Sequence, residues 1–479
     1  MNKKSVKRNY IYNLIYQMLI LLTPFITMPY ISRVLGADGI GLSSYTNSVV
    51  TYFVLIAVLG TSDYGQREIA YRQDDVKKRS KMFWEVFSLR VITSLLSLGL
   101  FFAVTWNSNY RLLYFLQSIN IISVMFDISW FFQGLEEFGK TVFRNSIVKG
   151  INLLVIFTMV KTNNDLPIYI ASITMSALTG HILIWFMLPR YICSIPVKEI
   201  RPFHNIKHVM QLFLPQIAIQ VMTVMDKTML GMITGSEFEN GYYEQADRIE
   251  KICLTIVSSL GVVMIPRISY VISKQENELL EHYIYRSYRF IWFMALPMTF
   301  GLVGIADHLV PWFFGMGYEK TIILIRIVSV LLCIVGISSV TGVQYFIPAG
   351  KQKQFTLSVA LGMAVNFFLN LLLIRGYLSI GAATATVVSE LTVTISQLVM
   401  VRKFFSIRKI LSLSRVYLVA TLLMSMIIFI IKPFTEASIK GTAVLVVIGS
   451  LTYILSLLGM KDEMVLGLLK EVRRSRKRY

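Results

Sequence analysis

Acidic and basic residues inside long apolar segments are the residues of this chain whose types and spacing suggest chemistry. One segment begins "VMQLFLPQIAIQVMTV" at Val209 and continues into "MDKTMLG", so that Asp226 and Lys227 are adjacent in a stretch long enough to cross a bilayer. A charged side chain at the centre of a membrane helix costs about 3 kcal/mol on insertion scales. Charges kept there bind a ligand or an ion, or pair with one another. The segment therefore predicts a polar site within a membrane.

Helical spacing separates these two charges. Lys227 completes a polar stripe whose other members, at intervals of three or four residues, are Gln216, Gln220 and Thr223. Asp226 lies about 100° around the helix from Lys227. We therefore expect Asp226 to meet a different neighbour, such as Arg248 or Lys251.

Comparable polar stripes occur in seven further apolar segments. They comprise Asn13, Gln17 and Thr27; Asn120, Ser123 and Asp127; Asn145, Lys149 and Asn152; Glu244, Arg248, Lys251 and Thr255; Arg326, Ser329 and Cys333; Ser358, Gly362, Asn366 and Asn370; and Thr386, Glu390, Thr394 and Gln397. In hydrocarbon such faces must meet protein or water. A single stripe fits helix–helix contacts as well as a cavity, whereas stripes on eight segments favour a shared hydrated cavity.

The charges within these stripes predict two kinds of binding residue. Cations suit an anionic group. The predicted substrate-binding residues are therefore the five cations Arg33, Lys227, Arg248, Lys251 and Arg326, together with the stripe amides Gln216, Gln220, Asn366 and Asn370. The acids Asp127, Asp226 and Glu390 are candidate ion-binding residues. Two i,i+4 pairs, Glu244–Arg248 and Asp247–Lys251, are expected to neutralise part of the positive charge. Nothing in the sequence predicts a catalytic residue, a metal site or a disulfide.

The composition indicates which elements position these residues. The chain has 479 residues, of which 55% are hydrophobic and 15% charged, and its mean hydropathy is +0.62. Apolar runs of about 20 residues span a bilayer as helices, so the expected fold is an all-α polytopic membrane protein with about fourteen spans. They are residues 10–32, 40–62, 83–105, 111–132, 142–160, 166–189, 208–234, 242–268, 286–306, 318–346, 354–374, 380–401, 414–431 and 441–459.

The distribution of basic residues predicts the orientation of these spans. Both ends of the chain and alternate loops carry 33 of the 47 lysines and arginines, the opposite loops carry seven, and seven lie within spans. Because cytoplasmic loops are enriched in Lys and Arg, both termini are expected in the cytoplasm. The net charge of +20 therefore reflects topology, and no nucleic-acid partner is expected.

A weak internal repeat predicts the domain organisation. "SRVLGADGIGLSSYTNS" after the first span and "DKTMLGMITGSEFENGYYEQA" after the seventh both place a glycine-containing loop between Leu-Gly and a tyrosine. Repeats six spans apart have the same orientation and predict two six-helix lobes related by a pseudo-two-fold axis along the membrane normal. The expected division is residues 1–207, 208–412 and 413–479, the last comprising two peripheral spans and a basic tail.

Several segments together resemble the O-antigen repeat-unit (Wzx-type) flippases of the multidrug/oligosaccharidyl-lipid/polysaccharide (MOP) exporter superfamily. They are "RVLGADGIGLSSYTNSVVTYFVLIAVLGTSDYGQREIA", "WFFQGLEEF", "MDKTMLGMITG" with "GYYEQADRI", "VMIPRIS" and "FIPAGKQKQFTLSVALGMAVNFFLNLLLIRGYLSIGAATATVVSE". The resemblance covers about residues 5–410. It implies a bacterial cytoplasmic membrane protein and not an enzyme.

The resemblance also implies a substrate and a mechanism. The substrate would be an undecaprenyl-diphosphate-linked oligosaccharide, carried to the outer leaflet by alternating access for capsule or O-antigen assembly. Coupling to a Na⁺ or H⁺ gradient or to the membrane potential is expected, as are a polysaccharide polymerase and chain-length proteins as partners, and no cofactor. The cationic role would fall on Arg33, Lys227, Arg248 and Arg326.

Three alternatives stay open at this point. A lipid II flippase is disfavoured because the first span offers Asn13, Tyr16 and Gln17 where such flippases carry arginines. A cation-coupled multidrug exporter of the same superfamily would line its cavity with acids, for which Asp127, Asp226 and Glu390 are candidates. A membrane enzyme such as a polymerase would need catalytic groups on a sizeable outer loop, and no such loop is found.

Overall fold

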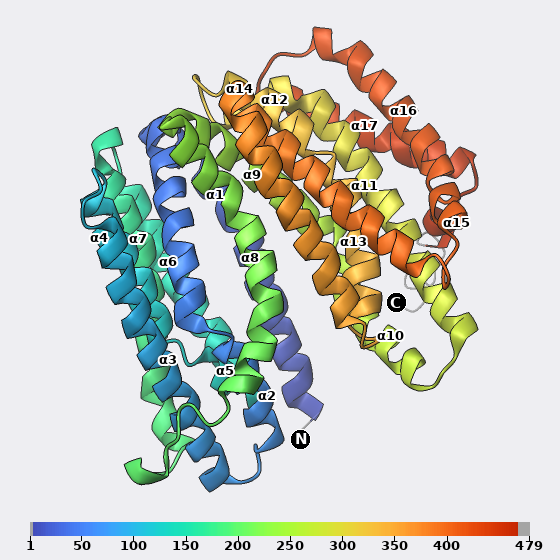
Figure 1. The fold of residues 1–479 in the computed structure, drawn as a ribbon. Helices are drawn as coiled ribbons and strands as arrows, with labels where there is room; N and C mark the ends of the chain where they lie inside the picture. The colour runs from blue at the N-terminus through green and yellow to red at the C-terminus, as the bar shows by residue number, and fades with distance from the viewer. Residues whose placement is uncertain (1–2, 468–479) are drawn as a thin grey trace. The chain divides into compact units, whose positions relative to one another are not determined.

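The computed structural model describes residues 3–467, apart from the side chains of residues 3–22, 138–143, 212, 214–216, 218 and 262. All regular elements in this part of the chain are helices, which confirms the predicted all-α class (Figure 1). They are α1 (Lys3–Val58), α2 (Thr61–Tyr71), α3 (Val76–Thr105), α4 (Arg111–Met125), α5 (Ser129–Gly134), α6 (Phe138–Met159), η1 (Asn163–Asp165), α7 (Leu166–Leu183), η2 (Ile184–Arg190), η3 (Val197–Glu199), α8 (Ile206–Thr234), α9 (Glu237–Val257), α10 (Ser259–Ser273), α11 (Asn277–Phe313), α12 (Glu319–Val328), α13 (Leu331–Ser339), η4 (Val340–Phe346), α14 (Gln352–Val401), α15 (Ile407–Ser412), α16 (Ser414–Ile431), η5 (Lys432–Phe434) and α17 (Ile439–Gly459).

Each of the fourteen predicted spans lies mainly on helix, with short breaks, for example at residues 59–60 in the span 40–62 and at residues 126–128 in the span 111–132. Among the described residues, ten helical segments are long and apolar enough to cross a membrane. Two of them, Thr23–Tyr71 and Gln352–Val401, each hold two predicted spans. The predicted spans 142–160 and 208–234 lie on α6 and α8, helices outside those ten. The chain is therefore a polytopic helical membrane protein.

Single non-helical residues separate the spans that share one long helix. Gly36 interrupts α1 with φ 67° and ψ 178°, a conformation that is essentially restricted to glycine. Leu378 interrupts α14 with φ 54° and ψ −130°. Gly235, between α8 and α9, also has a positive φ of 61°. In the two repeat segments, the glycines with a positive φ are thus Gly36 and Gly235. Gly231, which follows Leu230 in the second segment, is not one of them.

The chain forms two compact units, Met1–Gly231 and Met232–Tyr479. In the first unit, α1 packs against α3, α4 and α6, and α7 packs against α4 and α6. The "MDKTMLG" segment of α8 lies directly on α1, since Thr228 Oγ1 lies 2.8 Å from Ser48 Oγ. A Cβ at Gly231 would come within 2.2 Å of the Tyr45 ring, so only glycine permits this approach.

The second unit is organised around α11, which packs against α10, α12, α13, α16 and α17. Glu239, at the start of α9, ties three helices together, because its carboxylate accepts hydrogen bonds from Lys320 at 2.7 Å and from the backbone N–H of Ser379 at 3.1 Å. Ser379 follows the break at Leu378 directly. The predicted two-lobe division stays a prediction, as does its symmetry.

The last two spans are fixed to α11 along its length. The Tyr453 hydroxyl donates to the carbonyl of Phe293 at 2.8 Å, and Trp312 Nε1 donates to Thr442 Oγ1 at 2.7 Å. At one end, His308 Nε2 lies 2.9 Å from the carbonyl of Thr435. These bonds join α17 and Thr435 to α11, and α16 packs against both α11 and α17, so the three helices form one packed group.

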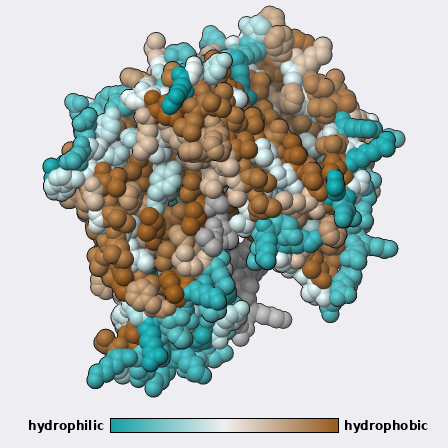
Figure 2. Space-filling model, in the orientation of Figure 1, coloured by the Kyte–Doolittle hydropathy of each residue, from teal (hydrophilic) through white to brown (hydrophobic). Residues whose placement is uncertain are grey.

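Apolar side chains cover the outside of the helices. On the face drawn in Figure 2, hydrophobic residues lie over the middle of the helices and hydrophilic residues gather at their ends. Large apolar side chains that are more than half exposed include Val104, Leu154, Leu372 and Phe429. Exposed apolar surface of this extent marks contact with lipid or another apolar partner, as the membrane assignment requires.

Candidate functional site

The two adjacent charges of α8 differ in burial, as their predicted separation on the helix requires. Asp226 is 3% exposed, whereas Lys227 is half-buried. Tyr52 of α1 hydrogen-bonds the side chain of Thr228 and lies near the Asp226 carboxylate. Asp226 therefore faces α1 of the same unit. Its predicted pairing with Arg248 or Lys251 stays a prediction.

The predicted ion pairs of α9 are confirmed. Arg248 Nε donates to Glu244 Oε1 at 2.6 Å, and Lys251 Nζ donates to Asp247 Oδ2 at 2.8 Å. Each predicted substrate-binding cation on this helix is thus partly neutralised. Glu250 is 4% exposed and has no hydrogen bond or ion pair to any residue within the described part of the chain. It interacts electrostatically with Glu390 of α14.

Arg326 belongs to a cluster of three charges that the sequence did not reveal. Its Nη2 donates to both carboxylate oxygens of Asp307, at 2.8 and 2.7 Å, and Lys432 also pairs with this carboxylate. Two cations share one acid, so the cluster keeps a net positive charge. Arg326 is partly exposed, which leaves it accessible to an anion.

The other predicted polar residues have different surroundings. Asn366 and Asn370 are fully buried, and Asn370 Nδ2 donates to Asn366 Oδ1 at 3.0 Å. A ligand would reach this pair only after a rearrangement. Arg33 is exposed and Gln220 is half-buried. The side chain of Gln216 lies outside the described residues.

Asp127 lies in a polar network at the break between α4 and α5. Its Oδ1 accepts from the backbone N–H of Ser129 at 2.9 Å and lies 3.8 Å from His181 Nε2. Arg90, completely buried, donates to the carbonyl of Asp127 at 2.6 Å and to the hydroxyl of Thr61 at 2.9 Å. The sequence singled out Asp127 but missed Arg90 and His181, which lie on other helices.

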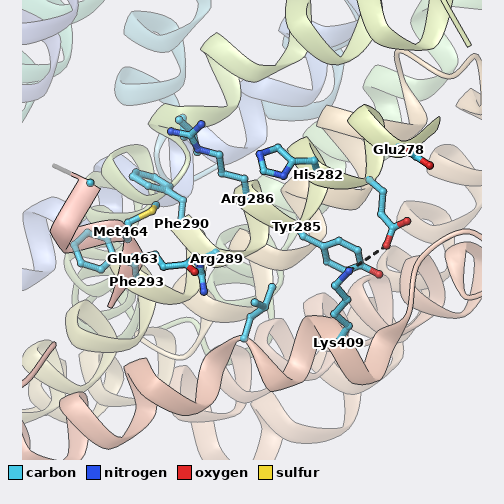
Figure 3. Close-up of a pocket in the computed structure, with 14 residues that line it drawn as sticks. Glu278, His282, Tyr285, Arg286, Arg289, Phe290, Phe293, Lys409, Glu463 and Met464 are labelled. Atoms are coloured by element: carbon cyan, nitrogen blue, oxygen red, sulfur yellow. Dashed lines mark hydrogen bonds and ion pairs between the residues drawn. The ribbon is translucent and has the colours of Figure 1, made fainter. Parts of the chain in front are cut away.

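The second unit also contains an open cavity of about 780 Å³. It lies between the beginning of α11, the α15 region and residues 463–467 (Figure 3). Basic, acidic and aromatic side chains line it, among them Arg286, Arg289, Lys409, Glu463 and Phe293. Within the described residues, no group of three or more His, Cys, Asp or Glu side chains could hold a metal ion.

Comparison with solved structures shows which known proteins share this fold. The chain is similar to an inward closed conformation of the lipid II flippase MurJ, with a TM-score of 0.68 and 17% identity, covering 92% of this chain and 99% of MurJ. It is also similar to an inward-facing MATE multidrug resistance transporter of the MOP superfamily, with a TM-score of 0.59 and 14% identity, covering 82% and 99%. The chain therefore has the fold of MOP-superfamily transporters.

Sequence comparison identifies the family. The family described as "Polysaccharide biosynthesis protein" matches residues 6–272, and the chain belongs to it. A putative O-antigen transporter of Escherichia coli (strain K12) is 23% identical over 416 residues, covering 84% of this chain and 98% of the relative. One of Shigella dysenteriae is 22% identical over 383 residues, covering 79% and 95%.

Proposed function

We propose that this protein is a flippase that moves an undecaprenyl-diphosphate-linked oligosaccharide from the inner to the outer leaflet of the bacterial cytoplasmic membrane. The observation that carries the proposal is membership of the polysaccharide biosynthesis family on a MOP transporter fold. The basic loops and both termini would face the cytoplasm. A polysaccharide polymerase and chain-length proteins would act on the delivered repeat unit.

The charges support an anionic substrate group. Lys227 is half-buried on α8, and the Arg326–Asp307–Lys432 cluster carries excess positive charge. Cations are suited to bind a diphosphate through charge-assisted hydrogen bonds. Arg248 and Lys251 would contribute less because Glu244 and Asp247 already hold them. Lys227, which ends the predicted polar stripe of α8, is the first residue to test as a diphosphate ligand.

Coupling to a cation gradient would use acids in the spans. Asp127 is near His181, Asp226 is buried near Tyr52, and Glu390 lies in the electrostatic field of Glu250. Buried acids within membrane spans commonly serve as proton or ion sites. Replacing Asp226 by Asn tests this role, and unchanged transport with an unchanged response to pH and sodium would reject it.

Proteoliposomes provide the direct test. Purified protein is reconstituted with a fluorescent undecaprenyl-diphosphate oligosaccharide, and a membrane-impermeant quencher measures how much label changes leaflet. We expect faster exchange than in empty liposomes and competition by unlabelled substrate. Labelled lipid II and a labelled organic cation form parallel arms. Transport of either in preference to the oligosaccharide would replace the proposal by a lipid II flippase or a multidrug exporter.

A further inference from the structure

The cavity at the beginning of α11 has a chemical order along one helix face. Glu278, His282 and Arg286 are spaced four residues apart and so share a face of α11. Phe290 and Phe293 continue it toward the centre of the span predicted for residues 286–306. Along α11 the lining therefore changes from acidic, through basic, to aromatic. All of these side chains belong to the second unit.

Two of the basic groups in the cavity already have acidic partners. Lys409 pairs with Glu281 at 3.2 Å and lies 4.0 Å from the centre of the Tyr285 ring, and Arg289 pairs with Glu463. Arg286 and Glu278 are exposed, and within the described part of the chain neither forms an ion pair. Among the described residues, the cavity therefore offers one cation and one anion that no opposite charge holds.

The walls of the cavity are held in place without a ligand. The hydroxyl of Tyr285 accepts from the backbone N–H of Ser406 at 2.9 Å, and Trp292 Nε1 donates to the carbonyl of Ile410 at 3.0 Å. These two bonds fix the α15 region to α11. The hydroxyl of Tyr417 donates to Asp462 at 3.0 Å, which anchors the chain just before Glu463. The helices that border the cavity are therefore held in place without a ligand, which lowers the entropy cost of binding.

We propose that this cavity binds a zwitterionic aminophospholipid of the surrounding bilayer, of the phosphatidylethanolamine type. The order of groups on α11 matches such a lipid in its leaflet. Glu278 would accept hydrogen bonds from the terminal ammonium, Arg286 and His282 would bind the phosphate, and Phe290, Phe293 and Leu413 would contact the acyl chains. The near balance of acidic and basic side chains in the lining favours a head group that carries both charges.

The proposal distinguishes this lipid from the other common head groups. Phosphatidylglycerol has the phosphate but no ammonium for Glu278. Phosphatidylcholine has the positive charge but no N–H to donate to a carboxylate. Binding at this site is separate from transport, so the proposal holds whichever lipid-linked substrate the protein carries.

Native mass spectrometry of the delipidated full-length protein tests the proposal. The protein is titrated with phosphatidylethanolamine, phosphatidylglycerol and phosphatidylcholine of identical acyl chains. We expect the ethanolamine lipid to bind first. Arg286→Gln should weaken its binding about tenfold, the size of one charge-assisted hydrogen bond, and Glu278→Gln should remove the preference over phosphatidylcholine.

Arg408→Gln provides the matched control, because Arg408 is exposed on α15 beside Lys409 and does not line the cavity. It should bind lipid as the unmodified protein does. Equal losses in the Arg286 and Arg408 variants would show non-specific charge attraction and overturn the proposal. Preference for phosphatidylglycerol, equal binding of the three lipids, or no lipid binding at all would overturn it as well. Both arginines are exposed, so the variants should fold.

Discussion

The Nε2 atom of His181 lies 3.8 Å from Oδ1 of Asp127, at the break between α4 and α5. The other ring nitrogen of His181, Nδ1, lies 2.9 Å from the carbonyl of Ser123. The hydroxyl of Ser123 lies 2.8 Å from the same Nδ1, so Nδ1 can donate to the carbonyl or accept from the hydroxyl, and a protonated ring donates from both nitrogens. A proton on Nε2 would point at the carboxylate. Arg90 and Arg144 are the other charges that act on this pair.

This geometry predicts that His181 contributes to any pH dependence of transport. His181→Gln keeps a polar side chain but cannot be protonated, so the rate of substrate exchange in proteoliposomes should vary less between pH 5.5 and 8. Asp127→Asn should flatten the same profile. His204→Gln, in a loop, is the control and should keep the original profile. A profile that keeps its shape in both His181 and Asp127 variants would contradict the prediction.

Lys227→Ala should abolish surface polysaccharide in a strain that depends on this protein, while the amount of protein in the membrane stays unchanged. Loss of a charge-assisted bond to the diphosphate accounts for the effect, about 1.5–3 kcal/mol for such a bond. Lys227→Arg should keep part of the activity because the charge remains. Surface polysaccharide is measured by gel, and a normal amount in the alanine variant would reject Lys227 as a ligand.

Glu239→Ala should destabilise the second unit strongly. Glu239 is buried and holds Lys320 and Ser379. Removing one partner of a fully buried ion pair costs about 3–5 kcal/mol, and the cost here is expected to be lower because the Lys320 side chain is 25% exposed. Thermal unfolding in detergent should therefore begin at a clearly lower temperature. Glu199→Ala, at an exposed position, should leave the transition unchanged. Equal transitions in the two variants would mean that the Glu239 cluster adds nothing to stability.

Gly36→Ala should cost more stability than Gly235→Ala. At Gly36 the backbone angles of φ 67° and ψ 178° suit glycine alone, and a Cβ would lie 2.5 Å from Asp38 Oδ1. Asp38 is not free to retreat, since its Oδ2 accepts from Asn163 at 2.9 Å. Around Gly235 a Cβ would meet nothing within 4 Å. Comparing the two unfolding temperatures checks the order, and the reverse order would contradict it.

The sequence predicted best what depends on local spacing. The fourteen apolar runs of bilayer length lie mainly on helix, because a run of that length crosses the hydrocarbon as a helix. The Glu244–Arg248 pair followed from i,i+4 geometry on one helix. The Arg326–Asp307 pair could not be predicted, because its partners lie on α12 and α11 and meet only through helix packing.

The polar stripes show a second limit of the sequence. Asn366 and Asn370 fall on a stripe that fits a cavity and a helix contact equally well, and the structure buries both completely. Periodicity identifies a face that avoids lipid but not what covers it. Arg90 gives a second example. The sequence shows a lone arginine in an apolar run, but it does not show that this arginine donates a hydrogen bond to the carbonyl of Asp127 at the break between α4 and α5.

The attachment of α16 and α17 to α11 also provides an internal distance standard for spectroscopy. Hydrogen bonds join α17 to α11 near the middle, at Tyr453 and Phe293, and near one end, at Trp312 and Thr442, and α16 packs against both. Spin labels placed on α11 and α17 should therefore keep one separation throughout a transport cycle. A change measured between either of these helices and the first unit would then report movement of the α11–α16–α17 group, not local bending of the labelled helix.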